Sequence, residues 1–510
     1  MSGGYNEMNL SENQQEIVNT TGNMIVSASA GTGKTHTMVA KIAKEIEDNH
    51  THKVIAAITF TIKAAKEIRD RLTIDTTEHF IGTNNSFAIE EIIKPFARDV
   101  YGADYYVEMC TDYSVKKRCF QECLEYLGTK KIICAYTDYK KNFVFELALD
   151  IMKKSKACRL FLKSKYFKIY VDEYQDCDKT MHEFFMYLCN NLKIELFVVG
   201  DDKQSIYMWR GAYPEAFRSI LKMEKFSKKV LRENYRSCFM IQNYSNLLSD
   251  DTRSLYKADL DTSSIVLIET CISKWVEKVK PYIDINKKVA LLRFSNNNAK
   301  VGASELNGIG TKFTYIPKTP ISDITTSAAW LYNAIAQYFI IEKYSVYDFM
   351  DEIPEESIGD RRIRHYLVEK LERIKSALKN NDDSSVIARV NEIASYFVYE
   401  TNEDHIKAMI KTIVDQSYHP AFHMDELSHV AITFHSSKGL EFDQVIIFAS
   451  DYPLKKLDDI NNHYVAVTRA KSKLIIVKLT DDEASNQYYK NIIDIFKKTG
   501  VNLKDVMTIV

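Results

Sequence analysis

The stretch "SASAGTGKTHT", residues 27–37, is the first place where residue type and spacing could carry chemistry. Two glycines, Gly31 and Gly33, let the backbone approach a ligand closely, and Lys34 and Thr35 follow at once. A phosphate chain suits such a loop, because backbone N–H groups, one lysine and a hydroxyl that holds Mg²⁺ can surround its oxygens. The pattern therefore indicates a nucleotide site in which Lys34 reaches the β- and γ-phosphates and Thr35 binds Mg²⁺.

The residues on either side of the loop favour this interpretation. "NMIVSAS" (23–29) is a short apolar run typical of a buried strand, and apolar residues recur every fourth position in "KTHTMVAKIAKEIED" (34–48), as in a helix. A strand, a glycine loop and a helix in this order point the N–H groups of the helix N-terminus at a phosphate. The alternative is an ordinary glycine turn that precedes a helix and binds nothing. The usual loop begins with glycine, and Ala28 in that position is a mild departure. The predicted loop comprises Ala28, Ser29, Ala30, Gly31, Thr32, Gly33, Lys34 and Thr35.

A pair of acids follows a second apolar run, "FKIYVDEYQDCD" (167–178). Asp172 and Glu173 fall at the carboxyl end of this predicted strand, where parallel sheets bind their ligands. Asp172 would reach Mg²⁺, and Glu173 would polarise the attacking water as general base. Gln204, just past the next strand, could orient that water or sense the γ-phosphate. An acidic turn after a core strand is the structural alternative.

Two arginines in compact motifs could complete a phosphoryl-transfer site. Arg236 lies in "LRENYRS" (231–237) and Arg469 in "YVAVTRAKSK" (464–473). Phosphoryl transfer benefits from cations that stabilise the charge spreading over the phosphate oxygens. The spacing alone does not exclude two surface arginines in salt bridges.

The elements that must position these residues alternate between strand and helix, which predicts parallel sheets with helices on both faces. Five strand candidates in the second half repeat this architecture, at 263–270, 287–295, 429–437, 444–450 and 473–479. We therefore expect an α/β fold of two lobes, each interrupted by a reduced helical insertion. The predicted boundaries are 1–88 and 160–236 for the first lobe, 89–159 for its insertion, 237–320 and 426–510 for the second lobe, and 321–425 for its insertion.

Composition excludes several classes of protein. The 510 residues are too many for one core, and a net charge of −1 means that any nucleic-acid binding must come from a local groove. Nine cysteines without C-x-x-C pairs argue against a zinc ribbon or a disulfide framework and favour the reducing cytoplasm. The N-terminus does not resemble a secretory signal, and no apolar run approaches the length of a membrane span.

The order of the motifs resembles that of the UvrD/Rep/PcrA group of superfamily 1 DNA helicases, over nearly the full length. "LSENQQEIV" resembles the Q motif, "SASAGTGKT" motif I (where a leading alanine is usual), "ITFTIKAAKEI" motif Ia, "DEYQD" motif II, "VVGDDKQSIYMWRGA" motif III, "LRENYRS" motif IV, "ITFHSSKGLEF" motif V and "YVAVTRAK" motif VI. The resemblance implies two RecA-like P-loop lobes that use ATP and Mg²⁺, and a DNA translocase or helicase of 3′–5′ polarity.

The resemblance also implies roles for single residues. Gln14 would bind adenine, Tyr235 would stack on it, and Glu441 would contact the ribose, while Arg236 and Arg469 would act as arginine fingers. Aromatic side chains that stack on bases suit single-stranded DNA, because stacking is independent of sequence. A buried aromatic cluster is the alternative for any one of them. The positions implied to contact DNA are Phe60, Asn85, Tyr207, Trp209, Arg210 and His435.

Some features depart from the family. Asn85 stands where the family often has histidine, and Asn461 and Asn462 replace a usual charged pair. Both insertions are short, as in the compact helicase-like subunits of anti-phage defence complexes, which work with a nuclease. Two hypotheses follow: a stand-alone translocase and helicase, or an ATPase that senses DNA ends and assists a partner nuclease with little unwinding of its own.

Overall fold

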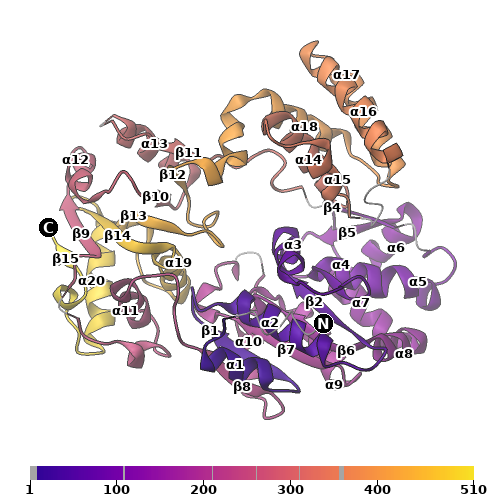
Figure 1. Ribbon diagram of the computed structural model, residues 1–510, viewed down its shortest axis with the longest axis horizontal. Coiled ribbons are helices and arrows are strands. Elements are labelled where there is room, and N and C mark those ends of the chain that lie inside the picture. The colour runs from indigo at the N-terminus through magenta and orange to yellow at the C-terminus, as the bar shows by residue number, and fades with distance from the viewer. Residues whose placement is uncertain are drawn as a thin grey trace.

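The computed structural model describes residues 9–106, 109–208, 211–259, 261–308, 310–324, 326–354 and 361–510. Trp209 and Arg210, two of the predicted DNA contacts, lie outside these described residues. The described chain forms one parallel sheet of six strands and another of seven, each flanked by helices (Figure 1). The predicted α/β class with two parallel sheets is therefore confirmed.

The first lobe is built on the six-stranded sheet, in the order β3-β2-β6-β7-β1-β8. Its strands are β1 (Met24–Ala28), β2 (Val54–Thr59), β3 (Phe80–Thr83), β6 (Tyr166–Val171), β7 (Glu195–Gly200) and β8 (Ser227–Leu231). Alternate residues of β1 enter opposite cores: Met24 and Val26 pack on one face of the sheet and Ile25 on the other. Because β6, β7 and β1 are neighbours, the loops that follow them meet at one edge of the sheet.

Helices cover both faces of the first sheet. The helices are α1 (Glu12–Asn19), α2 (Lys34–Glu47) and α3 (Ile62–Arg71) on one face, and α9 (Lys179–Asn190) and α10 (Glu215–Leu221) on the other. The segment between β3 and β6 contains α4 (Asn84–Ala88), a π-helical turn η1 (Ile89–Ile93), α5 (Lys94–Tyr101), β4 (Cys110–Lys117), α6 (Phe120–Lys130), β5 (Ile132–Tyr136), α7 (Phe143–Lys154) and α8 (Lys156–Lys165). Strands β4 and β5 pair in parallel, so this insertion, which the sequence predicts to be mostly helical, also contains a two-stranded sheet.

The second lobe is built on the seven-stranded sheet, in the order β11-β12-β10-β13-β14-β9-β15. Its strands are β9 (Ile265–Thr270), β10 (Val289–Arg293), β11 (Thr314–Tyr315), β12 (His429–Thr433), β13 (Phe442–Phe448), β14 (Ala470–Leu479) and β15 (Thr508–Ile509). The five predicted strands of this half are confirmed as β9, β10, β12, β13 and β14. One face packs on α11 (Phe239–Leu247), α19 (Leu457–Val467) and α20 (Glu483–Lys497), and the other on α12 (Trp275–Val279) and α13 (Asn296–Asn307).

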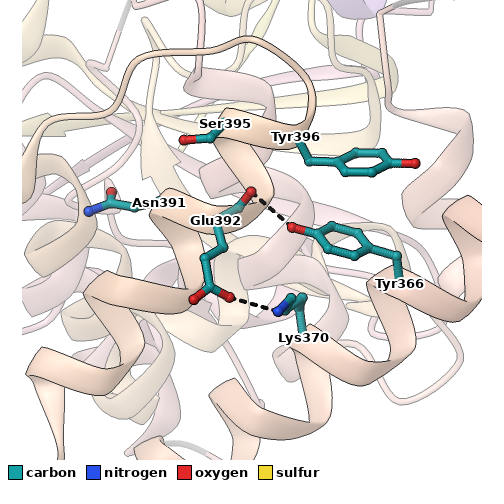
Figure 2. A pocket seen from close by; sticks show the side chains of 6 residues that line it. All are labelled: Tyr366, Lys370, Asn391, Glu392, Ser395 and Tyr396. Carbon is teal, nitrogen blue, oxygen red and sulfur yellow. Dashed lines mark hydrogen bonds and ion pairs between the residues drawn. The ribbon is translucent and has the colours of Figure 1, made fainter.

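The second insertion is helical and has a hydrophobic core of its own. It comprises α14 (Ala329–Ile340), α15 (Val346–Asp351), α16 (Arg361–Lys379), α17 (Asp383–Tyr396) and α18 (Glu403–Val414). Helices α16 and α17 project as a pair (Figure 1). Figure 2 shows the contacts that join them: Tyr366 donates to the backbone oxygen of Glu392 at 2.9 Å, Lys370 pairs with the Glu392 carboxylate at 2.8 Å, and Tyr366 stacks on Tyr396. These contacts fix the hairpin and are remote from the phosphate loop.

The two insertions also touch one another, because the Cys110 thiol on β4 donates to Glu400 at 3.2 Å. We retain the boundaries 89–159 and 321–425 for the insertions as a proposal. Within the described ranges, no helix is both long and apolar enough to cross a membrane.

Candidate functional site

The loop that follows β1 adopts a conformation that requires glycine at two positions. Gly31 and Gly33 have φ angles of +77° and +78°, a region that other residues rarely adopt. A β-carbon on Gly31 would lie 2.5 Å from the Asn234 side chain and 2.6 Å from Arg236 Cβ. A β-carbon on Gly33 would lie 2.8 Å from Gln14 Nε2. The loop is therefore packed closely against two of the predicted nucleotide motifs, and it ends at the N-terminus of α2.

The residues predicted to bind the base lie beside this loop. Gln14 belongs to the capping box that starts α1, in which its side chain accepts from the Ser11 amide at 3.1 Å. Tyr235 donates its backbone N–H to Gly31 O at 2.9 Å, yet its side chain is 60% exposed. Its hydroxyl bonds to Glu233. The Tyr235 ring is exposed, and its backbone is hydrogen-bonded to the phosphate loop, so it could stack on an adenine bound there. This role stays a prediction.

The predicted acid pair faces the loop lysine. Glu173 Oε1 lies 3.6 Å from Lys34 Nζ, and Gln175 donates its side-chain amide to the same carboxylate. Burial would raise the pKa of Glu173, but Lys34 and a second lysine, Lys438, outweigh it and hold the pKa below its usual value. Glu173 is thus ionised at neutral pH, as a general base must be.

Asp172 has the opposite electrostatics. Its side chain is buried, with 6% exposed, and burial and then the charge of Glu173 raise its pKa. Its Oδ1 accepts the Glu173 amide at 2.8 Å. A buried carboxylate with too little positive charge around it fits a bound cation, so the site accords with the predicted Mg²⁺ position of Asp172 and Thr35.

Lys438 is a member of the site that the sequence analysis did not single out. It comes from the second lobe, after β12, and its ammonium pairs with Asp176 and lies 4.0 Å from Glu173 Oε2. It also donates to Gln204 O at 3.2 Å and lies 4.8 Å from the centre of the Tyr207 ring. In the sequence, Lys438 could have been noticed only as the lysine of "HSSKGLEF", a segment whose lysine had no predicted role.

The two predicted arginine fingers lie together at the boundary between the lobes. Arg236 Nε pairs with Glu441 Oε2 at 2.9 Å, so the predicted ribose ligand and the predicted finger are joined here. Arg469 is 1% exposed, and its guanidinium donates to Val465 O at 2.9 Å and Leu440 O at 3.1 Å. Burial and then the charge of Arg236 lower its pKa to about 9, and Glu173 is among the groups that oppose the shift. Positive charge is thus concentrated near Glu173, the predicted general base.

Gln204 lies at the end of η3 (Asp202–Gln204) with a buried side chain. Its amide Nε2 donates to Asp201 Oδ2 at 2.8 Å. Its predicted role toward the water or the γ-phosphate stays a prediction.

Four of the residues predicted to contact DNA lie in the described part of the chain, and they come from several segments of both lobes. Phe60 packs partly on the first core, Asn85 donates to the Tyr113 hydroxyl at 3.2 Å, and Tyr207 follows η3. His435 follows β12, and its ring lies 3.8 Å from that of Phe434. Each lies beyond the carboxyl end of a strand, and their contacts with DNA stay predictions.

Comparison with known proteins agrees with this geometry. Residues 14–210 match the AAA domain family, and residues 429–477 match the UvrD-like helicase C-terminal domain family. The chain is 24% identical over 437 residues to ATP-dependent DNA helicase Rep of Escherichia coli (strain K12), covering 75% of this chain and 60% of Rep. It is 29% identical over 286 residues to ATP-dependent DNA helicase PcrA of Bacillus subtilis (strain 168), covering 46% of this chain and 38% of PcrA.

A further relative matches from end to end. Gabija protein GajB of Bacillus cereus (strain VD045) is 40% identical over 488 residues, which cover 94% of this chain and 97% of GajB. The predicted resemblance to UvrD-like helicases is confirmed, and with it a nucleotide-binding P-loop domain and the ATPase and helicase domains of that group. The chain belongs to the GajB family of UvrD-like superfamily 1 helicases.

Proposed function

We propose that this protein is an ATP-driven motor on single-stranded DNA or DNA ends, of 3′–5′ polarity, that serves anti-phage defence together with a GajA-like nuclease. The observation that carries the proposal is that the nucleotide site takes residues from both lobes. Lys34 and Glu173 come from the first lobe, and Lys438 and Arg469 from the second. Hydrolysis in such a site depends on how the lobes meet, which is what converts ATP turnover into movement.

In this proposal each side chain has one role in hydrolysis. Lys34 binds the β- and γ-phosphates, Glu173 accepts the proton of the attacking water, and Arg236 and Arg469 stabilise the charge that develops on the phosphate. The ionised state of Glu173 supports its role. Gln204 would position the water.

Mg²⁺ would be held by Thr35 and Asp172, where it would neutralise phosphate charge during the transfer. The raised pKa of Asp172 supports this role, because a cation would favour its ionised form. Adenine would lie between Gln14 and Tyr235, with Glu441 at the ribose.

DNA would cross the ends of the strands that carry Phe60, Asn85, Tyr207 and His435. Aromatic rings on both lobes would hold bases in turn as the lobes open and close, at about 1–3 kcal/mol per stacked base. Trp209 and Arg210 belong to the same proposed track. The name of GajB supports a Gabija role for this chain, since the two chains align over nearly their whole lengths.

The test is steady-state ATPase with and without a saturating single-stranded oligonucleotide. Wild-type ATP turnover should rise when DNA is added. Lys34→Ala should abolish ATP turnover while the protein still folds and melts cooperatively. Lys44→Ala is the matched control, because Lys44 lies on the same helix and pairs with Asp48 at the surface. Lys34→Ala activity above about a tenth of wild type would contradict the phosphate role.

Strand separation distinguishes the two modes of action. Duplexes with a 3′ or a 5′ single-stranded tail are offered to the chain alone and to the chain with its nuclease partner. Unwinding of the 3′-tailed duplex by the chain alone supports the stand-alone helicase. ATPase that responds to DNA ends, with little unwinding unless the nuclease is present, supports the end-sensing mode instead.

A further inference from the structure

The hydroxyl of Tyr464 joins two loops of the first lobe, although Tyr464 itself lies on α19 of the second. The phosphate-loop amide of Ala30 donates to this hydroxyl at 3.2 Å. The hydroxyl in turn donates to Asp201 Oδ2, also at 3.2 Å. Asp201 directly follows β7 and begins the loop at residues 201–208, which leads to the proposed DNA contact Tyr207.

The protons of this bridge have one consistent arrangement. A phenol has a single proton, and here it points to the carboxylate of Asp201, which leaves a lone pair for the Ala30 N–H. Burial and then Asp201 raise the pKa of Tyr464 to about 12, so the hydroxyl keeps its proton at neutral pH. The same Asp201 oxygen accepts the Gln204 side chain at 2.8 Å, and Lys203 pairs with Oδ1 at 2.8 Å. The phosphate loop is thus linked through one hydroxyl to the carboxylate that orients Gln204.

Helix α19 fixes the second loop at another point. One turn before Tyr464, the Asn461 amide donates to Ser205 O at 3.2 Å and lies 3.5 Å from Asp202 O. Packing agrees with the hydrogen bonds, because Ala30 and Ile206 are both buried in the hydrophobic core of the second lobe. Both loops are therefore seated on one helix of the opposite lobe.

We propose that Tyr464 is a positioning residue that makes the phosphate loop and the loop at 201–208 respond to each other, while Asn461 anchors the second loop to the same helix. In a buried network of this kind, moving one loop alone leaves the Ala30 N–H without its acceptor, or removes one of the donors to the Asp201 carboxylate. The inference deepens the proposed function, on which it rests: phosphate binds at one loop and DNA beside the other.

Hydrogen exchange of the full-length protein without nucleotide is the first test. Tyr464→Phe removes only the hydroxyl, so exchange in peptides covering 28–32 and 201–208 should accelerate at least about tenfold, as expected when a buried hydrogen bond to a charged acceptor is lost. Tyr452→Phe is the matched control, because its hydroxyl is buried in the same core and has no hydrogen-bond partner among the described residues. Unchanged exchange at 201–208 in Tyr464→Phe would overturn the proposal, as would equal acceleration in the control.

A second variant decides the matter if Tyr464→Phe shows no cooperative melting. Asn461→Ala removes the anchor of the second loop alone, so exchange should rise at 201–208 and stay near wild type at 28–32. If exchange at 201–208 does not change in this variant, α19 does not position the loop and the proposal fails.

The response itself is measured with a non-hydrolysable ATP analogue and Mg²⁺. In wild type the analogue should slow exchange at 28–32 and also at 201–208. Tyr464→Phe should keep the first effect and lose the second, and a variant that keeps both would refute the coupling. If the analogue slows exchange at neither loop in wild type, nucleotide binding as proposed is wrong, and the nucleotide-free measurement alone decides the positioning role.

Discussion

Replacing Lys438 by methionine tests how strongly one lysine of the second lobe holds the first. The side chain keeps its length and loses its charge, so the change removes the ion pair with Asp176 and the attraction to Glu173. Lys438 and Asp176 are only 13% and 7% exposed, which makes this a buried pair. Breaking a buried pair by removing one partner costs about 3–5 kcal/mol, because the other charge is left uncompensated.

We expect the lower end of that range, because the stranded acid can take up a proton. Burial, only partly offset by Lys438, already raises the pKa of Asp176 to about 6, and losing Lys438 would raise it further. A loss of about 3 kcal/mol corresponds to a fall in melting temperature of roughly 6–12 °C for a unit of about 150–250 residues. Removing the stranded charge as well, in Lys438→Met with Asp176→Asn, should restore most of this loss.

Differential scanning calorimetry at neutral pH provides the measurement. Lys407→Met is the matched control, since Lys407 pairs with Glu403 at the surface within one helix, where solvent screening leaves an ion pair little effect on stability. A shift below about 2 °C for Lys438→Met would mean that losing the pair costs less than about 1 kcal/mol, which contradicts the predicted loss. A double variant no more stable than the single one would show that the lost charge pairing is not the cause.

Three further predictions concern the core and the site. Burial lowers the pKa of His463 to about 3, below its unfolded value of 6.5, so this residue contributes stability that is complete above pH 6.5 and is lost as pH falls toward 3. The loss should reach about 2 kcal/mol at pH 5, and a His463→Gln variant whose chemical denaturation depends on pH between 7 and 5 as steeply as wild type would refute this origin. Glu173→Gln should keep ATP affinity and lower turnover by about 10²-fold or more, whereas an equal loss of binding and turnover would exclude the role of general base. Gly31→Ala should destabilise the protein by about 1–3 kcal/mol and also abolish nucleotide binding, because its β-carbon meets Asn234 and Arg236; Gly22→Ala, at φ +81° in open space, should show the strain alone, and normal nucleotide binding by Gly31→Ala would disprove the close packing.

The parts of the site that the sequence predicts are those encoded in contiguous residues. Lys34 and Thr35 follow a strand and a glycine loop, and Asp172 and Glu173 end another strand, so local pattern alone places each group at the edge of a sheet. Each of these side chains follows its own strand closely in the sequence. In the folded sheet only β7 separates β1 from β6, so the two groups end up close together.

Contacts between the lobes carry no such local signal. Ala30 and Tyr464 are 434 positions apart, and Lys438 reaches Asp176 from 262 positions away. The parallel pair β4 and β5 was missed for a related reason: β4 is only half-buried, "CTDYSVKK" lacks an apolar run, and its partner comes after a helix. Such strand pairings depend on tertiary packing, so the hydrophobic periodicity of the sequence does not predict them.

The burial of Ala30 and Ile206 in the core of the second lobe has a consequence for folding during synthesis. The phosphate loop leaves the ribosome early, but the tyrosine that holds Ala30 is synthesised 434 residues later. At a synthesis rate of about 5–20 residues per second, Tyr464 is added roughly 20–90 s after Ala30. A nascent chain therefore carries every residue of the phosphate loop well before Lys438 and Tyr464, which contact the first-lobe site, have been synthesised.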